Sequence, residues 1–244
     1  MSMYKNSLSK EEWAKHYNIK NLESVIQSIN NSSVQPWAEK LVDIIPVNAK
    51  CLEIGCGTGI SSLWLAKQGR SVTALDYTEE SIELVKMAAN HLDLDIDVVK
   101  CDATKELPFK QGEFDYIFQC GLLEHFDTST QINLLKKWGN YGKNMISMIP
   151  NAASLAYRVG KEIMERNGTW AYGLEIPKSS MRYEFEKAGF RGIEEYSIGS
   201  EWATKFLPNN HELRDSILNM LYKGMPLDDY LQGYLIVTIG KGLN

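Results

Sequence analysis

The stretch that decides the fold is Glu53-Ile54-Gly55-Cys56-Gly57-Thr58-Gly59, which joins an apolar run to a segment with helical periodicity. Glycines in such a turn let the backbone bend tightly and approach a ligand without interference from a Cβ atom. The first turn of the following helix offers N–H groups that have no partner within the helix. In an open parallel sheet, ligands bind at this carboxyl edge of the strands. We therefore expect a nucleotide-like ligand at this turn.

An acidic residue ends the next apolar run (71–76), because Asp76 lies 21 residues after Gly55. A carboxylate at that position can accept hydrogen bonds from both hydroxyls of a ribose. A glycine-rich turn is weak evidence by itself, but the turn and the acid together indicate a ligand that contains adenosine. A dinucleotide fingerprint, G-x-G-x-x-G, would need glycine at position 60. This chain has Ile60 there, and its spacing is G-x-G-x-G.

Short apolar runs predict the strands of one sheet, and segments with helical periodicity lie between most of them. The expected strands are 51–55, 71–76, 96–101, 114–120, 144–149, 190–198 and 234–240. Strands that are apolar throughout and are separated by helices form a parallel sheet covered on both faces. Helices are expected from about residue 58, over 78–92, around Leu155, Val159 and Ile163, over 181–188 and over 211–223. The predicted fold class is α/β, a doubly wound and mostly parallel seven-stranded sheet with N-terminal helices and a helical insertion after the fifth strand.

Composition and charge argue against several classes of protein. The chain has 244 residues, with 26 Lys and Arg against 31 Asp and Glu and a net charge of −5. A general nucleic-acid binder needs clustered basic residues, which are absent here. No apolar run approaches the ~20 residues of a membrane span, and the N-terminus has no apolar signal segment, so we expect a cytoplasmic protein without membrane association. The four cysteines form no Cys-x-x-Cys pair and no cluster with histidine, which predicts reduced thiols and no metal site.

The acid followed by G-x-G-x-G resembles motif I of the class I S-adenosylmethionine-dependent methyltransferases, and residues 34–149 are similar to the core of that family, in its small-molecule branch. Asp76-Tyr77 resembles the family's ribose clamp and adenine contact, and Cys101-Asp102-Ala103 resembles the segment that reads the adenine edge. Residues 119–125 are similar to the loop that leaves the fourth strand. The resemblance implies S-adenosylmethionine as the cofactor and an antiparallel last strand. The cofactor-binding residues that it implies are Glu53, Gly55, Cys56, Gly57, Asp76, Tyr77, Asp102, Ala103, Gln119, Cys120 and Tyr17.

Two features leave a functional and a structural interpretation open. His125 ends the exit loop, and an imidazole with an ordinary pKa of about 6.5 suits proton removal near neutral pH. The alternative is a loop histidine that bonds a backbone carbonyl. Trp13 and Tyr17 are spaced i, i+4, and in relatives a helix at this position folds over the methionine end of the cofactor. Packing alone accounts for this pair equally well, and Glu124 is expected either near the site or on the surface.

The chain divides, by expectation, into an N-terminal helical cap over residues 1–46 and a methyltransferase domain over residues 47–244. Insertions at about 151–180 and 199–226 are expected to form a substrate cap. Exposed aromatic residues Trp170 and Tyr172 beside Glu175 suit such a cap, and a plain packed loop is the alternative.

The resemblance implies transfer of a methyl group from S-adenosylmethionine to a small-molecule nucleophile by in-line displacement. His125 is the candidate catalytic residue, and the expected partner is a small-molecule methyl acceptor. One alternative is a methyltransferase-like protein that binds the cofactor without turnover. Another is an NAD-dependent oxidoreductase, which lacks support because the glycine at position 60 is missing.

Overall fold

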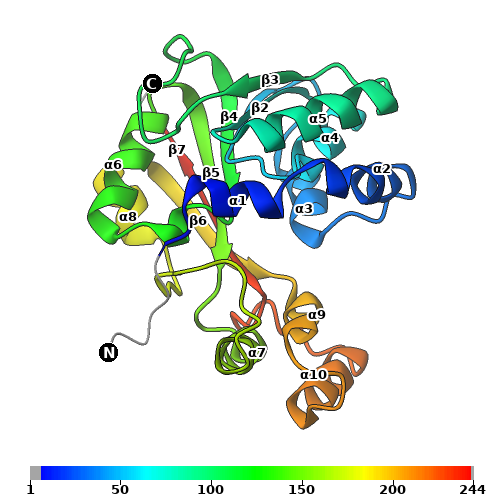
Figure 1. Ribbon diagram of the computed structural model, residues 1–244. Coiled ribbons are helices and arrows are strands. Elements are labelled where there is room, and N and C mark those ends of the chain that lie inside the picture. The colour runs from blue at the N-terminus through cyan, green and yellow to red at the C-terminus, as the bar shows by residue number, and fades with distance from the viewer. Residues whose placement is uncertain (1–6, 243–244) are drawn as a thin grey trace.

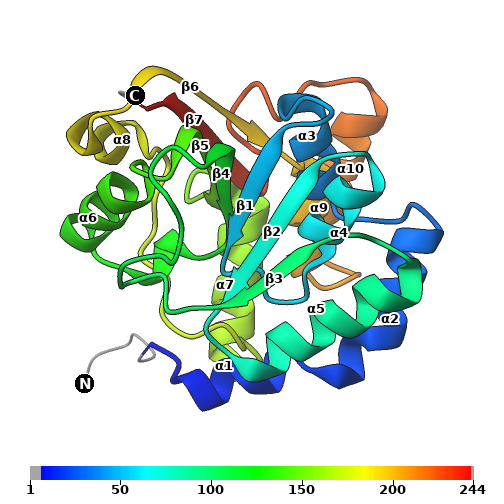
Figure 2. The same ribbon diagram turned by 90° about the horizontal axis from the view of Figure 1, so that it is seen from above.

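Seven strands form one mixed sheet in the computed structural model, which describes residues 7–242. The strands are β1 (Lys50–Ile54), β2 (Ser71–Asp76), β3 (Asp97–Lys100), β4 (Phe114–Cys120), β5 (Gly142–Pro150), β6 (Arg191–Ile198) and β7 (Leu235–Lys241). Their order is β3-β2-β1-β4-β5-β7-β6, and β7 runs antiparallel to both of its neighbours (Figure 2). The predicted doubly wound α/β fold, with its antiparallel last strand, is confirmed.

The direction in which the chain crosses the sheet reverses beside β1. From β1 the chain passes outward through β2 to β3, and it then returns to β4 on the other side of β1. Ligands of doubly wound folds bind at the carboxyl ends of the strands at such a reversal. The glycine turn 55–59 leaves β1 at this point, so the topology places the predicted motif where a ligand would bind.

Helices cover both faces of the sheet. On one face lie α3 (Pro36–Ile44), α4 (Ile60–Lys67) and α5 (Glu79–Leu92), and on the other lie α6 (Thr128–Trp138) and α8 (Arg182–Ala188) (Figure 2). Successive side chains of β1 alternate between these faces. Leu52 packs in the cluster under α6 and α8, whereas Cys51 packs with Leu41 and Leu65 on the opposite face. Both faces of the strand are therefore buried, which explains its continuous apolar sequence.

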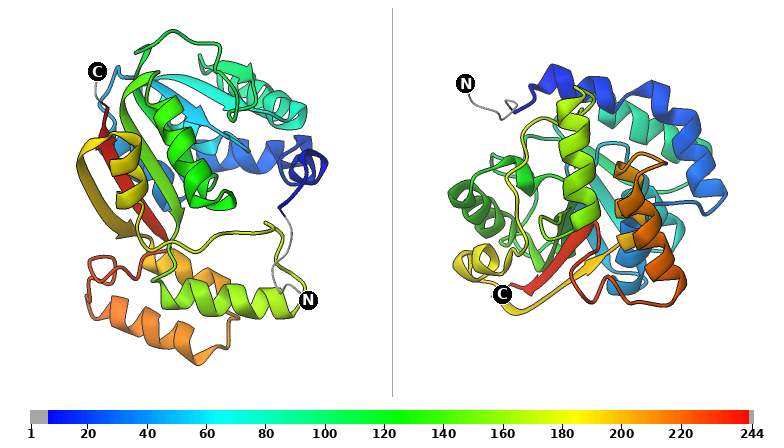
Figure 3. Two further views of the ribbon diagram at one scale, coloured as in Figure 1. Left: turned by 90° about the vertical axis from the view of Figure 1, so that its left-hand side faces the viewer. Right: turned by 90° about the horizontal axis from the view of Figure 1, so that it is seen from below.

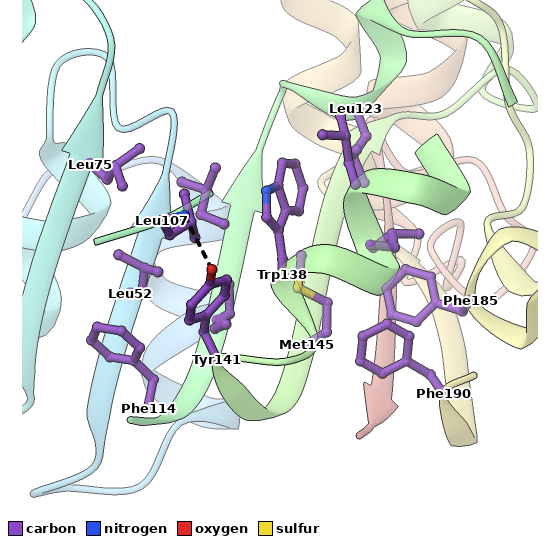
Figure 4. Close-up of a cluster of buried hydrophobic side chains, with 14 of the residues drawn as sticks. Leu52, Leu75, Leu107, Phe114, Leu123, Trp138, Tyr141, Met145, Phe185 and Phe190 are labelled. Carbon is purple, nitrogen blue, oxygen red and sulfur yellow. Dashed lines mark hydrogen bonds between the residues drawn. The ribbon is translucent and has the colours of Figure 1, made fainter. Parts of the chain in front are cut away.

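One large buried cluster holds α6 and α8 on the sheet (Figure 4). Trp138 and Phe185 are both 0% exposed and pack with Phe114 and Met145. Each large side chain of this kind stabilises the fold by about 1.5–3 kcal/mol through burial. Tyr141 lies in the same cluster, and its hydroxyl accepts a hydrogen bond of 3.2 Å from the backbone N–H of Leu107, so its polar end is satisfied.

The two predicted insertions fold together as one cap beyond the carboxyl ends of the central strands (Figures 1 and 3). The cap consists of α7 (Leu155–Arg166), α9 (Ser200–Ala203), the 3-10 turn Thr204–Phe206 and α10 (Glu212–Tyr222). Tyr157, Trp170 and Ile217 belong to its apolar cluster. Gly160 permits a close contact within the cap, because a Cβ atom there would lie 2.5 Å from Cβ and 2.6 Å from the carbonyl carbon of Phe206.

Two expectations from the sequence, for Leu155 and Trp170, require correction. Leu155 is 52% exposed, because α7 instead buries Ala156, Tyr157 and Gly160. Trp170 is 2% exposed, since its ring packs inside the cap.

The segment 1–46 is the expected N-terminal helical cap, and its residues 1–6 lie outside the described residues. Its helices α2 (Leu22–Asn30) and α3 pack against α4 in the body of the domain. The helix α1 (Lys10–His16) crosses the ends of the strands (Figure 1). Between residues 7 and 242, no helix has the length and apolarity needed to span a membrane.

Gly160→Ala tests the close contact inside the cap. Alanine raises helix propensity by about 1 kcal/mol relative to glycine, so an unconstrained helix would be stabilised. At 2.6 Å from the backbone of Phe206, however, the added methyl group requires the two segments to separate. We expect a net destabilisation of about 1–3 kcal/mol, measured by urea unfolding. Leu155→Ala, on the exposed side of the same helix, should change stability by less than about 0.5 kcal/mol and serves as the control. A more stable Gly160→Ala protein would contradict the contact.

Candidate functional site

The glycine turn after β1 is held against β2 by backbone hydrogen bonds. The N–H groups of Gly55 and Cys56 both donate to the carbonyl oxygen of Leu75, at 2.8 and 3.0 Å. Gly59 has a φ of +71°, and a Cβ atom there would lie 2.4 Å from Val85 Cγ2. Glycine at this position therefore allows both the left-handed turn and the close packing of α4 against α5.

Asp76 meets this turn at the end of β2. One carboxylate oxygen, Oδ2, accepts a hydrogen bond of 3.1 Å from the N–H of Gly57. The other, Oδ1, accepts from the N–H and the hydroxyl of Thr78, both at 2.9 Å. These bonds orient the carboxylate and leave a lone pair on Oδ2 for a ligand. The side chain is 6% exposed and lines the cavity described below.

Glu53, near the end of β1, holds the first turn of α4 in place. Its Oε2 accepts from the N–H and the hydroxyl of Ser62. Burial raises the pKa of Glu53 to about 8, although the two bonds from Ser62 oppose this shift. The side chain therefore belongs to the support of the turn as well as to the cavity wall.

Gln119 does not take the place that the sequence comparison implied for it. The side chain is 0% exposed and does not line the cavity. Its Nε2 donates to the hydroxyl of Ser147 at 2.6 Å, and its Oε1 accepts from the N–H groups of Leu122 and Leu123 at 2.8 and 3.3 Å. Because every polar group of the side chain is used inside the protein, Gln119 shapes the exit loop of β4. Its assignment as a cofactor-binding side chain is therefore corrected.

A cavity of about 950 Å³ lies at the carboxyl ends of β1, β2 and β4, between the sheet and the cap. Apart from Gln119, the structure brings all of the predicted site residues to its wall, although the chain spaces them over more than a hundred positions. These residues are Tyr17, Glu53, Gly55, Cys56, Gly57, Asp76, Tyr77, Asp102, Ala103, Cys120 and His125.

The end of α1 covers the glycine turn. The ring of Tyr17 lies 3.4 Å from the position that a Cβ atom of Gly57 would take. Trp13 stacks on Tyr17 with ring centroids 5.9 Å apart, and it also meets the ring of His125 edge-on at 5.1 Å. His16 lies 5.8 Å from the ring of Tyr172, which belongs to the loop after α7. The N-terminal segment, the exit loop of β4 and the cap loop therefore meet through aromatic rings.

His125 lies on the cavity wall with one ring nitrogen already bonded. Its Nδ1 lies 2.7 Å from the carbonyl oxygen of Leu174 and donates to it, which leaves Nε2 as the acceptor nitrogen. Burial lowers the pKa of His125 below its ordinary value, against the opposing effects of the Leu174 carbonyl and Glu175. The ring is therefore neutral at pH 7. The hydrogen bond to the Leu174 carbonyl fits the structural interpretation of His125. The acceptor nitrogen Nε2 still allows this residue to act as a base.

Glu124 is a site residue that the sequence left undecided. It is 3% exposed and lines the cavity, and its Oε2 has no hydrogen-bond partner among the described residues. Glu175 contrasts with it, because Oε2 of Glu175 accepts from the hydroxyl of Tyr157 and, at 2.6 Å, from Lys161. The carboxylate of Glu175 is thus paired inside the cap.

Sequence analysis missed the aromatic residues that line the cap side of the cavity. They come from the start of α3, from the segment 200–206 and from the residue before β7. No motif connects these positions, and their aromatic character is the one signal in the sequence that could have drawn attention to them. They are Trp37, Trp202, Phe206 and Tyr234.

Comparison with known proteins supports the assignment of the fold and of the motif. Residues 51–143 match the family model described as Methyltransferase domain. The chain is 28% identical over 155 residues to the ubiquinone biosynthesis O-methyltransferase of Xanthomonas axonopodis pv. citri (strain 306), covering 60% of this chain and 64% of that protein. It is 25% identical over 184 residues to an S-adenosyl-L-methionine-dependent Diels-Alderase of Talaromyces variabilis, covering 69% and 62%. The chain thus spans less than two thirds of the length of these curated relatives.

A solved structure of a SAM-dependent methyltransferase of Thermotoga maritima, described as a possible histamine N-methyltransferase, superposes with a TM-score of 0.60 at 14% identity. The match covers 98% of this chain and 99% of that one, and at this identity it shows the fold. The matched segment contains the glycine turn, Asp76 and the exit loop of β4, whose geometry is described above. Residues 51–143 thus match a methyltransferase domain, and the chain as a whole has the fold of the class I, Rossmann-like S-adenosylmethionine-dependent methyltransferases.

Proposed function

We propose that this protein transfers a methyl group from S-adenosylmethionine to a small-molecule acceptor held between the sheet and the cap. The observation that carries the proposal is the single cavity of about 950 Å³ that joins the glycine turn and Asp76 to the aromatic residues of the cap. Small-molecule sites occupy about 300–1,000 Å³, so this volume accommodates a cofactor and a second molecule together.

The residues of the sheet side fit S-adenosylmethionine. Gly57 presents backbone to the cavity where a side chain would meet the ring of Tyr17, and Oδ2 of Asp76 keeps a lone pair for a ribose hydroxyl. Asp102 and the N–H of Ala103 would hold the adenine edge, with Tyr77 beside it. When bound, the cofactor supplies a methyl group activated by a positively charged sulfur.

The protein's own contribution is alignment, exclusion of water and removal of a proton. The cap and the end of α1 meet over the cavity through aromatic contacts, which would keep bulk water from the reacting atoms. The Nε2 atom of His125 would accept the proton of the acceptor's nucleophilic group. Its partner at Nδ1, the carbonyl oxygen of Leu174, holds the ring in the required tautomer.

A second candidate function is binding of the cofactor to promote a reaction other than methyl transfer, as the name of the Talaromyces relative implies for that protein. The two candidates differ in the fate of the cofactor. Incubation with methyl-labelled S-adenosylmethionine and a panel of small acceptors should transfer label to one of them and release S-adenosylhomocysteine. Tight cofactor binding without consumption across the panel would favour the second candidate.

Asp76→Ala should weaken S-adenosylmethionine binding by about 1.5–3 kcal/mol, which corresponds to the loss of hydrogen bonds to a charged group. Isothermal titration calorimetry measures the change. Asp97→Ala is the matched control, because Asp97 is an exposed acid at the opposite end of the neighbouring strand β3. An unchanged dissociation constant in a folded Asp76→Ala protein would contradict the ribose assignment.

Gly57→Val should abolish cofactor binding while the secondary structure persists, because valine resists a φ of +53° and its side chain would enter the cavity. Gly112→Val controls for the backbone strain alone, since Gly112 has a φ of +66° and no neighbouring atom within 4 Å of its Cβ position. Both variants should lose stability, and only Gly57→Val should lose binding in calorimetry. Equal cofactor affinity in the two variants would place the cofactor elsewhere.

His125→Ala should slow the chemical step by roughly 10²–10⁴ while cofactor affinity stays within about twofold. A base must be unprotonated, and the pKa of His125 is lowered by burial, so the wild-type single-turnover rate should rise with pH below about 6.5 and be level at neutral pH. That rise should disappear in the variant. His91→Ala, which removes an exposed histidine of α5, should keep the wild-type profile. Retention of the rise in His125→Ala would eliminate the base.

A further inference from the structure

Acidic side chains predominate among the ionisable residues on the cavity wall. Among the described residues that line it are five carboxylates, two histidines and neither lysine nor arginine. The carboxylates belong to Glu53, Asp76, Asp102, Glu124 and Glu175. A buried anionic group is costly unless a cation pairs with it, so this wall disfavours a phosphate or carboxylate on the acceptor.

Four of these carboxylates already have protein partners. Glu53 accepts from Ser62, Asp76 from Gly57 and Thr78, and Asp102 from the N–H of Thr104 at 3.0 Å. Glu175 is paired with Lys161. The fifth acidic group, that of Glu124, differs from these four.

One oxygen of the Glu124 carboxyl group is buried and has no partner among the described residues. The residue is 3% exposed, and its Oε2 has no hydrogen-bond partner among the described residues. Its Oε1 lies 3.9 Å from Nε2 of His125, which is beyond hydrogen-bond distance. A buried oxygen without a donor costs about 1–3 kcal/mol, and such groups in native proteins are associated with ligands or function. A ligand that satisfies this oxygen in its carboxylate form must bring a donor.

Aromatic rings line the same cavity, among them those of Tyr17, Tyr172 and Tyr234. Burial, followed by the charges of Tyr172 and Glu124, raises the pKa of Tyr17. Burial, followed by the charges of Glu175 and Glu124, also raises the pKa of Tyr234. Both phenols are thus neutral and lie within electrostatic reach of Glu124. The faces of such rings attract cations, with energies of about 0.5–2 kcal/mol per contact.

We infer that the acceptor is an organic amine, whose ammonium group is bound by the carboxylate of Glu124 among the rings of Tyr17, Tyr172 and Tyr234. This inference rests on the proposed methyl transfer and specifies its substrate class. An ammonium group supplies a donor for the unpartnered oxygen of Glu124, and its charge suits a wall whose described residues include five acidic side chains and neither lysine nor arginine. The amide of Gln35, also on the wall, can donate or accept and does not discriminate between acceptor classes.

Binding of this ammonium has a proton signature. Burial, reinforced by Glu175, raises the pKa of Glu124 well above its usual range, so the free carboxyl group keeps its proton to a higher pH than an exposed glutamate does. An ammonium group that pairs with Glu124 favours the carboxylate form, so amine binding should be accompanied by proton release. The titratable and charged groups that face Glu124 from neighbouring elements are Tyr17, Cys120, His125, Tyr157, Lys161, Glu175 and Tyr234.

Methyl transfer then requires the bound ammonium group to lose one proton, which leaves a lone pair on its nitrogen. Nε2 of His125, 3.9 Å from Oε1 of Glu124, is placed to accept this proton. The lone pair left on nitrogen forms the new N–C bond, and the electrons of the broken S–C bond remain on sulfur. The acceptor leaves as the methylated amine.

The test is calorimetric titration of the full chain saturated with S-adenosylhomocysteine. The probes are ethylamine, phenethylamine and tryptamine, each compared with the alcohol and the carboxylate of the same skeleton. At pH 7, in phosphate and in Tris, at least one amine should bind about 10- to 100-fold more tightly than its alcohol, and the carboxylates should not bind. The difference in heat between the buffers should show a net release of protons on amine binding.

Glu124→Gln preserves shape and removes the charge. It should weaken amine binding by about 10- to 100-fold and abolish the buffer dependence, while the affinity for S-adenosylhomocysteine stays within about twofold. Glu201→Gln, on the exposed side of α9, makes the same change in the cap and should behave as wild type.

Two outcomes would overturn the inference without touching the proposed function. One is binding of S-adenosylhomocysteine with no amine preferred over its alcohol. The other is amine binding that Glu124→Gln leaves unchanged. Absence of S-adenosylhomocysteine binding would instead contradict the proposed function itself.

Discussion

The hydrogen bond from the N–H of Gly57 to the carboxylate of Asp76 joins the ends of β1 and β2 at the point where the chain reverses its path across the sheet. Together with the bonds from Gly55 and Cys56 to Leu75, it holds the glycine turn in one conformation. The position of α4 follows from this turn, because Gly59 brings it close to Val85 of α5. The cavity, the cover formed by α1 and the exit loop of β4 are all arranged around this junction.

Electrostatics divides the cavity into two functional halves. On the sheet side, carboxylates are held by backbone N–H groups and hydroxyls and retain capacity for a polar ligand. On the cap side, aromatic rings dominate, and Glu175 is neutralised by Lys161. Glu124 lies on the wall of the same cavity, and its Oε2 has no hydrogen-bond partner among the described residues. A low local dielectric strengthens any interaction that Glu124 makes with a ligand, and it also makes the unpaired group costly.

The errors of the sequence analysis have physical causes. Gln119 follows an apolar run and precedes a loop, as a ligand-binding residue would, but a neighbouring strand supplies Ser147 as its partner. Trp170 lies in a segment rich in glycine and polar residues, and its burial depends on helices from another insertion. The helix α6 was not predicted, although Asp127 caps it by accepting from the N–H of Thr130 at 2.9 Å, which is a local signal. Leu155 begins α7, where periodicity does not establish which face another element will cover.

The sequence by itself determined the alternation of strands and helices, the doubly wound class, the glycine turn and the acid that faces it. These depend on local periodicity, on glycine conformations and on spacing along the chain, all of which can be read from one segment at a time. Only the tertiary structure decided that residues 151–180 and 199–226 form one cap, that Oε2 of Glu124 is buried without a partner among the described residues, and that lysine and arginine are absent from the described wall of the cavity. Burial and pairing of a charge depend on side chains that come from distant parts of the chain, and the fold alone brings these together.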